Sequence, residues 1–266
     1  MALESINPAT EELLEAFDEW SSGKTQETLT AVNLAWRDWR QTGFEERSDK
    51  WRQVAQVLRQ NKNEYARIMA LEMGKPITSG RGEIEKCAWV CEHYADNAAT
   101  MLTEEPAQSD GTRSYVAFRP LGTILAVMPW NFPFWQVFRF AAPTLMAGNT
   151  GVLKHASNVM RCALAIEDIF RQAGFPENVF RTLMISAEQV DAVIENKLIK
   201  ALTLTGSDAA GRKVAAKAGD MLKKVILELG GSDPFIVLAD ADVEASAETA
   251  AKSRCINSGQ SCIAAK

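Results

Sequence analysis

Short apolar runs alternate with helical segments from residue 121 onward, and this rhythm limits the possible fold more than any other feature of the sequence. The runs cover residues 121–128, 150–154, 179–185, 200–204 and 224–229. Strands and helices in alternation are typical of a parallel sheet with helical crossovers. We therefore predict an α/β fold, a doubly wound parallel sheet of five strands of the Rossmann-like, dinucleotide-binding type.

An N-terminal helical segment precedes the sheet. From residue 25 to about residue 101, apolar side chains recur at spacings of three and four, as at Val32, Ala35, Trp36 and Trp39. We expect the tryptophans to be core anchors. Glycines divide the segment into about four helices, at positions 43, 74, 80 and 82.

Shorter signals flank these two regions. Asn7–Thr10 is a turn signal before a short apolar run over residues 13–17, and residues 102–118 hold a polar turn and a strand. Beyond the sheet, we predict a further strand over Pro234–Leu238 and a helix over residues 243–253. This pair is interpreted as the opening of a second domain.

The composition is that of an ordinary globular protein. Of 266 residues, 47% are hydrophobic and 24% charged, with a net charge of −5. This balance gives no basic patch for nucleic acid, and no run of about 18 apolar residues marks a membrane span. The N-terminus lacks the basic start and apolar run of a signal peptide, so we expect a cytoplasmic protein without nucleic-acid or membrane partners.

The cysteines favour a reduced compartment. Their odd number and scattered spacing do not suggest a disulfide framework; they are Cys87, Cys91, Cys162, Cys255 and Cys262. Cys87 and Cys91 lie near His93 on a predicted helix, which could suggest a metal site. A fourth ligand at a usual spacing is missing. Core packing is the better interpretation, and we predict no metal.

Two groups capable of chemistry stand near the end of the chain. Cys262 follows Gly259-Gln260-Ser261, and Glu228 opens Glu-Leu-Gly-Gly, 262 − 228 = 34 residues earlier. A thiolate is a strong nucleophile, and a nearby carboxylate can take a proton from the thiol or from a water. Taken alone, each residue has a simpler interpretation, a small buried thiol and a capped strand end.

Three loops after predicted strands could bind a ligand. Asn131, in Pro-Trp-Asn-Phe-Pro, could donate a hydrogen bond to an oxyanion, or equally well bond its own backbone in a rigid loop. Lys154 and Ser157 follow the second strand, where dinucleotide folds contact the adenosine ribose, and bring no carboxylate. Thr205–Gly211 could attract phosphate at a helix start, although its Gly-x4-Gly spacing is also that of a plain turn.

Taken in order, these motifs resemble the aldehyde dehydrogenase superfamily. They are Pro-Trp-Asn-Phe-Pro, Lys-x-x-Ser, Thr-Gly-Ser-x4-Gly, Glu-Leu-Gly-Gly and Gly-Gln-x-Cys, and the last two are highly specific. The resemblance covers essentially the whole chain and implies oxidation of an aldehyde to its acid with NAD or NADP. It also implies an NAD(P)-binding domain over residues 1–96 and 119–230, an oligomerisation arm over 97–118, and the start of a catalytic domain over 231–266.

The resemblance assigns a role to each motif. Cys262 is expected to attack the aldehyde, Asn131 and the backbone N–H of Cys262 to form the oxyanion hole, and Glu228 to activate the water that hydrolyses the thioester. Phe132, Trp135 and Arg139 are expected to contact the substrate. The expected cofactor contacts are Met128, Pro129, Trp130, Lys154, Ser157, Gly206, Ser207, Gly211, Leu229 and Gly230.

Two positions narrow the subfamily. Arg139 occupies a position where many relatives carry an aromatic residue and succinate-semialdehyde dehydrogenases carry arginine, and it could clamp the distal carboxylate of a four-carbon semialdehyde. Its alternative interpretation is a charge on a helix surface. Ser157 replaces the glutamate that NAD-preferring members place on the ribose hydroxyls. NADP should therefore be accepted, and we expect NADP or NAD as the cofactor.

Members of this family continue well past the cysteine, so the resemblance suggests an incomplete catalytic domain and arm. An unpaired sheet edge and an uncovered apolar face should follow. The full-length family implies a homodimer or homotetramer. Two alternatives to the enzyme therefore stay open: a cofactor-binding module without turnover, and a subunit that needs a complementary chain.

Overall fold

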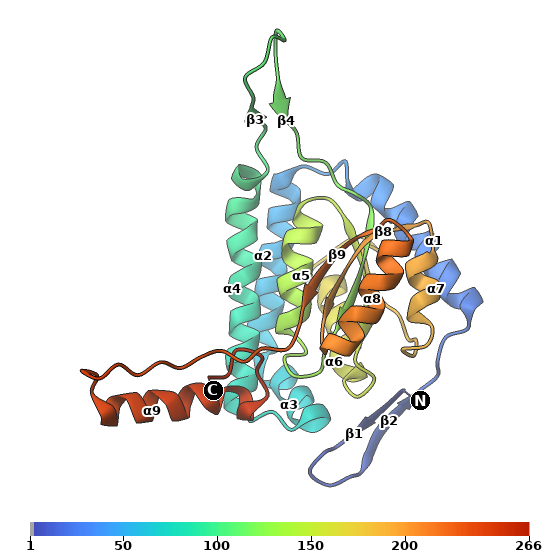
Figure 1. Ribbon diagram of the computed structural model, residues 1–266. Helices are drawn as coiled ribbons and strands as arrows, with labels where there is room; N and C mark the ends of the chain where they lie inside the picture. The colour runs from blue at the N-terminus through green and yellow to red at the C-terminus, as the bar shows by residue number, and fades with distance from the viewer. Residues whose placement is uncertain (1–2, 266) are drawn as a thin grey trace.

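A parallel sheet forms the centre of the molecule in the computed structural model, which describes residues 3–265. Within these residues, five strands pair in the order β7-β6-β5-β8-β9 (Figure 1). They are β5 (Thr123–Met128), β6 (Thr150–His155), β7 (Phe180–Thr182), β8 (Ile199–Thr205) and β9 (Lys224–Glu228). Each lies within one residue of its predicted run or inside it, so the predicted doubly wound α/β fold is confirmed. The strand order reverses at the β5–β8 pair, which is where such sheets bind ligands.

Helices cover both faces of the sheet. Because successive strand residues point to opposite faces, Leu125 packs on one side with α1, α7 and α8, while Ala126 packs on the other with α2 to α6. The crossover helices are α5 (Trp135–Met146), α6 (Met160–Gln172), α7 (Val190–Glu195) and α8 (Asp208–Asp220).

The N-terminal segment forms the helices predicted for it: α1 (Ser22–Trp39), α2 (Phe44–Gln60), α3 (Lys62–Met73) and α4 (Ile77–Met101). Trp39 and Trp51 are fully buried, as core anchors should be. Gly43 and Gly74 stand at helix ends, but the expectation that Gly80 and Gly82 also divide helices is wrong. One glycine costs a helix only about 1 kcal/mol, and α4 gains more by packing along α2, α3 and α5.

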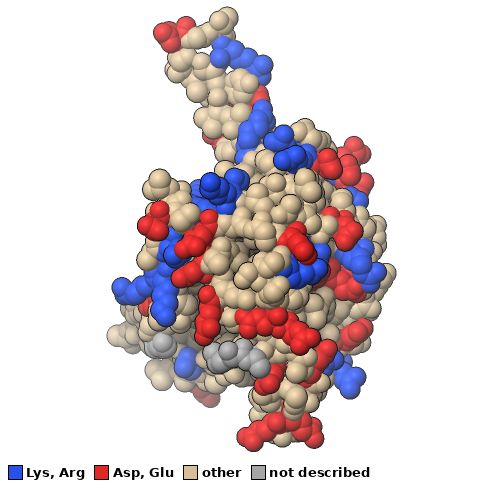
Figure 2. Space-filling model, turned by 90° about the vertical axis from the view of Figure 1, so that its right-hand side faces the viewer, with Lys and Arg blue, Asp and Glu red and all other residues tan. Residues whose placement is uncertain are grey.

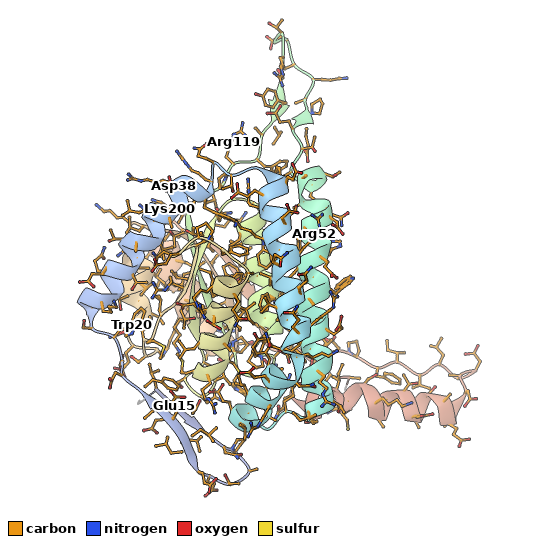
Figure 3. All side chains as sticks on the ribbon, turned by 180° about the vertical axis from the view of Figure 1, so that it is seen from behind. Glu15, Trp20, Asp38, Arg52, Arg119 and Lys200 are labelled. Atoms are coloured by element: carbon orange, nitrogen blue, oxygen red, sulfur yellow. The ribbon has the colours of Figure 1, made fainter. Side chains whose placement is uncertain are left out.

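Ion pairs join α2 to α4 on their outer surface. The Arg52 guanidinium lies 2.9 Å from Asp96 and 3.0 Å from Asp49, at the position labelled in Figure 3. Two turns further along α2, Arg59 binds Glu92 and Glu85. These bonds raise the pKa of the Arg59 guanidinium and lower the pKa of both carboxyls. The pairs are half-exposed, so packing rather than charge supplies most of the stability here.

Two antiparallel hairpins extend from the body. β1 (Leu3–Ile6) pairs with β2 (Leu13–Phe17) across the predicted turn, and β3 (Glu105–Pro106) pairs with β4 (Tyr115–Val116). The second hairpin projects well beyond the helices (Figure 1). Basic and acidic side chains are mixed over the face seen in Figure 2, with acidic ones gathered at its lower end near the β1–β2 hairpin.

The predicted strand over Pro234–Leu238 is wrong. These residues form no ladder with any other part of the described chain, and the bridge between Asp233 and Ala265 is isolated. A strand needs a partner for its N–H and C=O groups, and Ile236 and Leu238 are mostly exposed instead. Helix α9 (Val243–Arg254) forms as predicted but buries none of its residues, and a 3₁₀ turn, η1 (Ile256–Gly259), follows it.

Among residues 3–265, no helix is long and apolar enough to cross a membrane, and no group of three or more His, Cys, Asp or Glu could hold a metal ion. Cys87, Cys91 and Cys162 are buried in the core, which confirms the packing interpretation for Cys87 and Cys91. Burial raises the pKa of all three thiols well above its ordinary value, so they stay protonated and unreactive.

Candidate active site

The turn after β5 holds Asn131 in a defined orientation. Its side-chain oxygen accepts a hydrogen bond from the N–H of Phe132 at 3.1 Å, and Nδ2 donates to the carbonyl of Gln260 at 2.7 Å. The first bond is the local one expected of a rigid loop, and the second reaches the segment before Cys262. Since an amide nitrogen carries two hydrogens, one N–H of Asn131 has no partner among residues 3–265 and could serve a ligand.

The segment before Cys262 is tied back to the same turn by Asn257. This residue is buried, and its Nδ2 donates to the carbonyl of Asn131 at 2.8 Å. Its φ of 51° lies in the left-handed region, which asparagine tolerates better than most residues. The sequence analysis missed Asn257; the signal available was an asparagine directly before Ser258-Gly259.

Gly231 brings the Glu-Leu-Gly-Gly motif against Cys262. A Cβ added at Gly231 would lie 2.2 Å from the carbonyl oxygen of Cys262, so no larger residue fits without a backbone shift. Glu228 ends β9, where its carbonyl accepts from the N–H of Gly206 at 3.0 Å and its side chain is half-exposed. The Asn131 turn, the Glu-Leu-Gly-Gly motif and the Cys262 segment together span about 130 residues of sequence, and they meet at one edge of the sheet.

Arg139 lies on the first turns of α5 and points toward Glu228. Its guanidinium is 3.7 Å from the Glu228 carboxylate and 3.4 Å from the hydroxyl of Thr205. These groups line a cavity of 430 Å³ together with Met128 and Gln136. Arg139 is thus partly buried on the helix and lies beside a candidate catalytic group, while its contact with the substrate remains a prediction.

A larger cavity, of 760 Å³, lies between α7 and α8 at the ends of β5, β6 and β8. Lys154 lines it, is 8% exposed, and makes no side-chain hydrogen bond or ion pair with any residue from 3 to 265. Burial lowers the pKa of its ammonium. A buried cation without a partner suits an anionic ligand, although Glu188 and Asp191 line the same cavity.

The other predicted cofactor residues surround this edge. Ser207 caps α8, accepting from the N–H of Ala210 at 3.3 Å, and Gly206 precedes it. Ser157 is partly buried in the turn after β6, and Trp130 is 39% exposed. Gly211, Leu229 and Gly230 pack around α8: a Cβ at Gly211 would meet Leu229, and Gly230 donates to Asp208. Met128 ends β5, and Pro129 follows it.

The two aromatic residues expected to contact substrate each lie against a lysine. The ring of Phe132 is 4.2 Å from Nζ of Lys75, and the ring of Trp135 is 3.9 Å from Nζ of Lys86. Neither ring lines the cavity beside Arg139. Both residues remain predictions as substrate contacts.

His155 supports the Asn131 turn and was not anticipated. Nε2 donates to the carbonyl of Pro133 at 2.9 Å, and Nδ1 accepts from the N–H of Ala156 at 3.0 Å. A neutral ring with its proton on Nε2 satisfies both bonds. Burial lowers the pKa of His155 to about 4.

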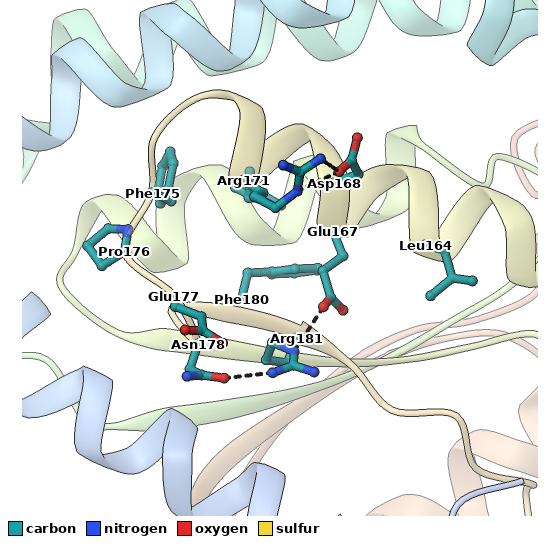
Figure 4. A pocket seen from close by; sticks show the side chains of 11 residues that line it. Leu164, Glu167, Asp168, Arg171, Phe175, Pro176, Glu177, Asn178, Phe180 and Arg181 are labelled. Carbon is teal, nitrogen blue, oxygen red and sulfur yellow. Dashed lines mark hydrogen bonds and ion pairs between the residues drawn. The ribbon is translucent and has the colours of Figure 1, made fainter.

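A further pocket, of 410 Å³, lies between α6 and β7, away from the motifs (Figure 4). Its charged groups are paired with one another: Arg181 lies 2.9 Å from Glu167, and Arg171 binds Asp168. No cation lining this pocket is left without an acidic neighbour, so it is a poor candidate for the active site.

The whole sequence matches one known family. The sequence model of the aldehyde dehydrogenase family covers residues 1–266. The chain belongs to the aldehyde dehydrogenase family. A relative named as a probable NADP⁺-dependent succinate-semialdehyde dehydrogenase, from Synechocystis sp., is 50% identical over the whole chain, and one from Mycobacterium leprae is 45% identical. The chain spans 59% of the length of each.

Solved aldehyde dehydrogenases share the fold closely. The succinic semialdehyde dehydrogenase of Streptococcus pyogenes, solved with NADP⁺, is 39% identical with a TM-score of 0.95 over 98% of this chain and 58% of that one. A succinate-semialdehyde dehydrogenase from Burkholderia pseudomallei is 31% identical with a TM-score of 0.94, over 100% of this chain and 55% of that one.

The buried histidine predicts an acid-sensitive fold. Because the pKa of His155 is lower in the folded state than its ordinary 6.5, the unfolded chain binds more protons between pH 6.5 and 4, and stability falls as the pH falls through this window. The shift in the pKa of His155 should lower the free energy of unfolding by roughly 3 kcal/mol in total across this window. Chemical denaturation of His155→Gln should show a much flatter pH dependence in this window than the unsubstituted chain.

His93, the other histidine in the sequence, supplies the matched control. His93→Gln should retain the decline in stability of the unsubstituted chain. The same decline in His155→Gln would show that other groups cause it.

Proposed function

We propose that the protein containing this chain oxidises succinate semialdehyde to succinate with NADP⁺, through a covalent intermediate on Cys262. The main support is the meeting of Asn131, Glu228 and the Cys262 segment at one edge of the sheet, through the bonds of Asn131 and Asn257 and the close approach of Gly231. Membership of the aldehyde dehydrogenase family and the names of the relatives add to it.

Cys262 begins the reaction as the nucleophile. After Glu228 has taken the thiol proton and passed it to solvent, the sulfur attacks the aldehyde carbon and a C–S bond forms. The former carbonyl oxygen becomes an oxyanion, which the remaining N–H of the Asn131 amide and the backbone N–H of Cys262 stabilise. When bound, NADP⁺ would supply the hydride acceptor that oxidation of this adduct to a thioester requires.

Glu228 completes the reaction as the general base. It takes a proton from a water that attacks the thioester carbon, the C–S bond breaks, and Cys262 leaves as a thiolate with release of the acid. The half-exposed position of Glu228 gives water access to its carboxylate.

The residues at the edge of β6 and α8 fit the cofactor. The ammonium of Lys154, which has no hydrogen-bond or ion-pair partner among residues 3–265, lines the 760 Å³ cavity and would bind the ribose phosphate. Ser157, in the turn after β6, would lie beside that phosphate. Gly206 and Ser207 would hold the pyrophosphate at the start of α8, where backbone N–H groups and the helix dipole favour an anion.

Arg139 gives the site its preference for a carboxylated aldehyde. Its contact with Glu228 is long and half-exposed, so it is worth at most about 1 kcal/mol. The distal carboxylate of a semialdehyde can therefore replace Glu228 on the guanidinium and form a bidentate pair. Binding of the substrate would at the same time release Glu228 for its role as base.

A cofactor-binding module without turnover is the second candidate. It is favoured by the large apolar side chains left exposed near the site, among them Ile236, Leu238 and Ile263. A subunit that requires a complementary chain would explain the same surface, with the β3–β4 hairpin as part of its dimer or tetramer arm. Turnover by the whole gene product that contains this chain distinguishes the enzyme from both.

Replacing the nucleophile tests the reaction itself. In the whole gene product, Cys262→Ala should abolish oxidation of succinate semialdehyde, by at least about 10³-fold, while NADP⁺ binds within about threefold of its original affinity in calorimetry. Cys255→Ala, seven residues earlier and exposed, is the matched control and should keep full activity. Undiminished turnover in Cys262→Ala would exclude the covalent mechanism.

Arg139→Leu tests the substrate. We expect KM for succinate semialdehyde to rise at least about tenfold, because a charge-assisted hydrogen bond is worth about 1.5–3 kcal/mol, while KM for butanal changes less than about twofold. Steady-state kinetics on both aldehydes provides the comparison. Equal losses on the two substrates would contradict the carboxylate role.

Ser157→Glu tests the cofactor. The added carboxylate should repel the 2′-phosphate and weaken NADP⁺ binding by about tenfold or more, since like charges in contact cost several kcal/mol. NAD⁺, without that phosphate, should bind as well or better in the same titration. Asn158→Glu places the same charge one residue further on; if it weakens NADP⁺ binding equally, the effect does not belong to position 157.

A further inference from the structure

The turn that carries Asn131 is held by the buried carboxylate of Glu83. Oε1 of Glu83, in the second turn of α4, accepts hydrogen bonds from the backbone N–H groups of Phe134 and Trp135, both at 2.9 Å. These are orphan donors at the start of α5, and a carboxylate there also matches the positive end of the helix dipole. Glu83 is thus bonded to the backbone three residues after Asn131.

Lys75 neutralises Glu83 inside the protein. Its ammonium binds Oε2 of Glu83, and the two side chains are 1% and 2% exposed. The same ammonium lies 4.2 Å from the centre of the Phe132 ring, next to Asn131. Both polar partners of this pair therefore contact the residues that follow Asn131.

Stability alone does not account for such a pair. Removing two charges from water is unfavourable, and well-packed apolar residues of similar volume often give equal or greater stability. What an apolar pair cannot provide is an acceptor for the two N–H groups of the turn. Oε1 of Glu83 therefore fixes the orientation of the Phe134 and Trp135 N–H groups, in addition to stabilising the turn.

A third contact holds the turn from the sheet side. His155, at the end of β6, donates to the carbonyl of Pro133 at 2.9 Å. Residues 132–135 are thus each contacted by a polar group from the loop before α4, from α4 or from β6. Asn131 itself reaches across to Gln260 with its amide.

We propose that Glu83, with Lys75 as its counter-ion, is a positioning residue that sets the orientation of the Asn131 amide for catalysis. This inference rests on the proposed function of Asn131 in the oxyanion hole. Neither Glu83 nor Lys75 contacts Asn131 or Cys262 directly; their contacts are with each other and with Phe132, Phe134 and Trp135. They act through the backbone of the turn, where a shift of about 1 Å can cost 10²-fold in rate.

Two double variants of the whole gene product isolate the acceptor. Lys75→Met with Glu83→Gln keeps an oxygen for the N–H groups of Phe134 and Trp135, whereas Lys75→Met with Glu83→Leu removes it; neither leaves a buried charge unpaired. We expect kcat for succinate semialdehyde to fall at least about tenfold in the Leu variant and to stay within about threefold in the Gln variant. The Kd for NADP⁺ should change less than about threefold in both.

Arg47→Met supplies the matched control for stability. Arg47 is buried at the other end of α5, where it donates to the carbonyl of Met146 at 2.5 Å. Its loss should lower Tm without lowering kcat by more than about threefold. An equal loss of kcat in Arg47→Met and in the Leu variant would overturn the inference, because α5 would then matter only through its stability.

Hydrogen exchange tests the contact without turnover. The amides of Phe134 and Trp135 should exchange at least about tenfold faster in the Leu variant than in the Gln variant or in Arg47→Met. Unchanged exchange would overturn the inference. If the unsubstituted protein oxidises no aldehyde, the proposed function fails, and the exchange rates still decide whether Glu83 holds the turn.

Discussion

Helix α5 is held at both ends by buried charges of opposite sign, and the packing of the helices around the sheet depends on this arrangement. Glu83 accepts from the N–H groups of Phe134 and Trp135 at its start, while Arg47 donates to the carbonyl of Met146 at its end. Each charge has the sign that its end of the helix dipole favours. Because α5 contacts α4, β5 and β6, fixing its ends also fixes the N-terminal helices against the sheet.

The candidate catalytic residues lie at the ends of strands and helices that surround α5. Asn131 stands where β5 gives way to α5, Glu228 where β9 ends, and Cys262 after η1. Three contacts connect them: the Asn131 side chain donates to the carbonyl of Gln260, the Asn257 side chain donates to the carbonyl of Asn131, and Gly231 lies against the carbonyl of Cys262. The site therefore combines a carboxyl-edge position typical of open α/β sheets with precise backbone contacts that no single motif contains.

Features that depend on the local pattern of apolar residues were predicted correctly, whereas features that depend on a partner elsewhere in the chain were not. Apolar runs predicted the five strands because a strand buried on both faces must be apolar along its length. The same reasoning failed for Pro234–Leu238, which is equally apolar but has no neighbouring strand within residues 3–265. Glycine positions predicted helix ends at Gly43 and Gly74 and failed at Gly80 and Gly82, since packing on α2, α3 and α5 outweighs local propensity there.

The sequence by itself determined the fold class, the family and the order of the motifs, because periodicity and short motifs are local properties of the chain. Only the tertiary structure decided that Arg139 faces Glu228, that Asn257 ties Asn131 to the cysteine segment, and that Glu83, Lys75 and His155 hold the turn between them. Apart from the Lys75–Glu83 pair, which joins residues 8 positions apart, these contacts join residues about 20 to 130 positions apart. A buried polar group needs a hydrogen-bond partner, and the tertiary fold determines which residue lies close enough to be that partner. No local sequence pattern encodes this proximity.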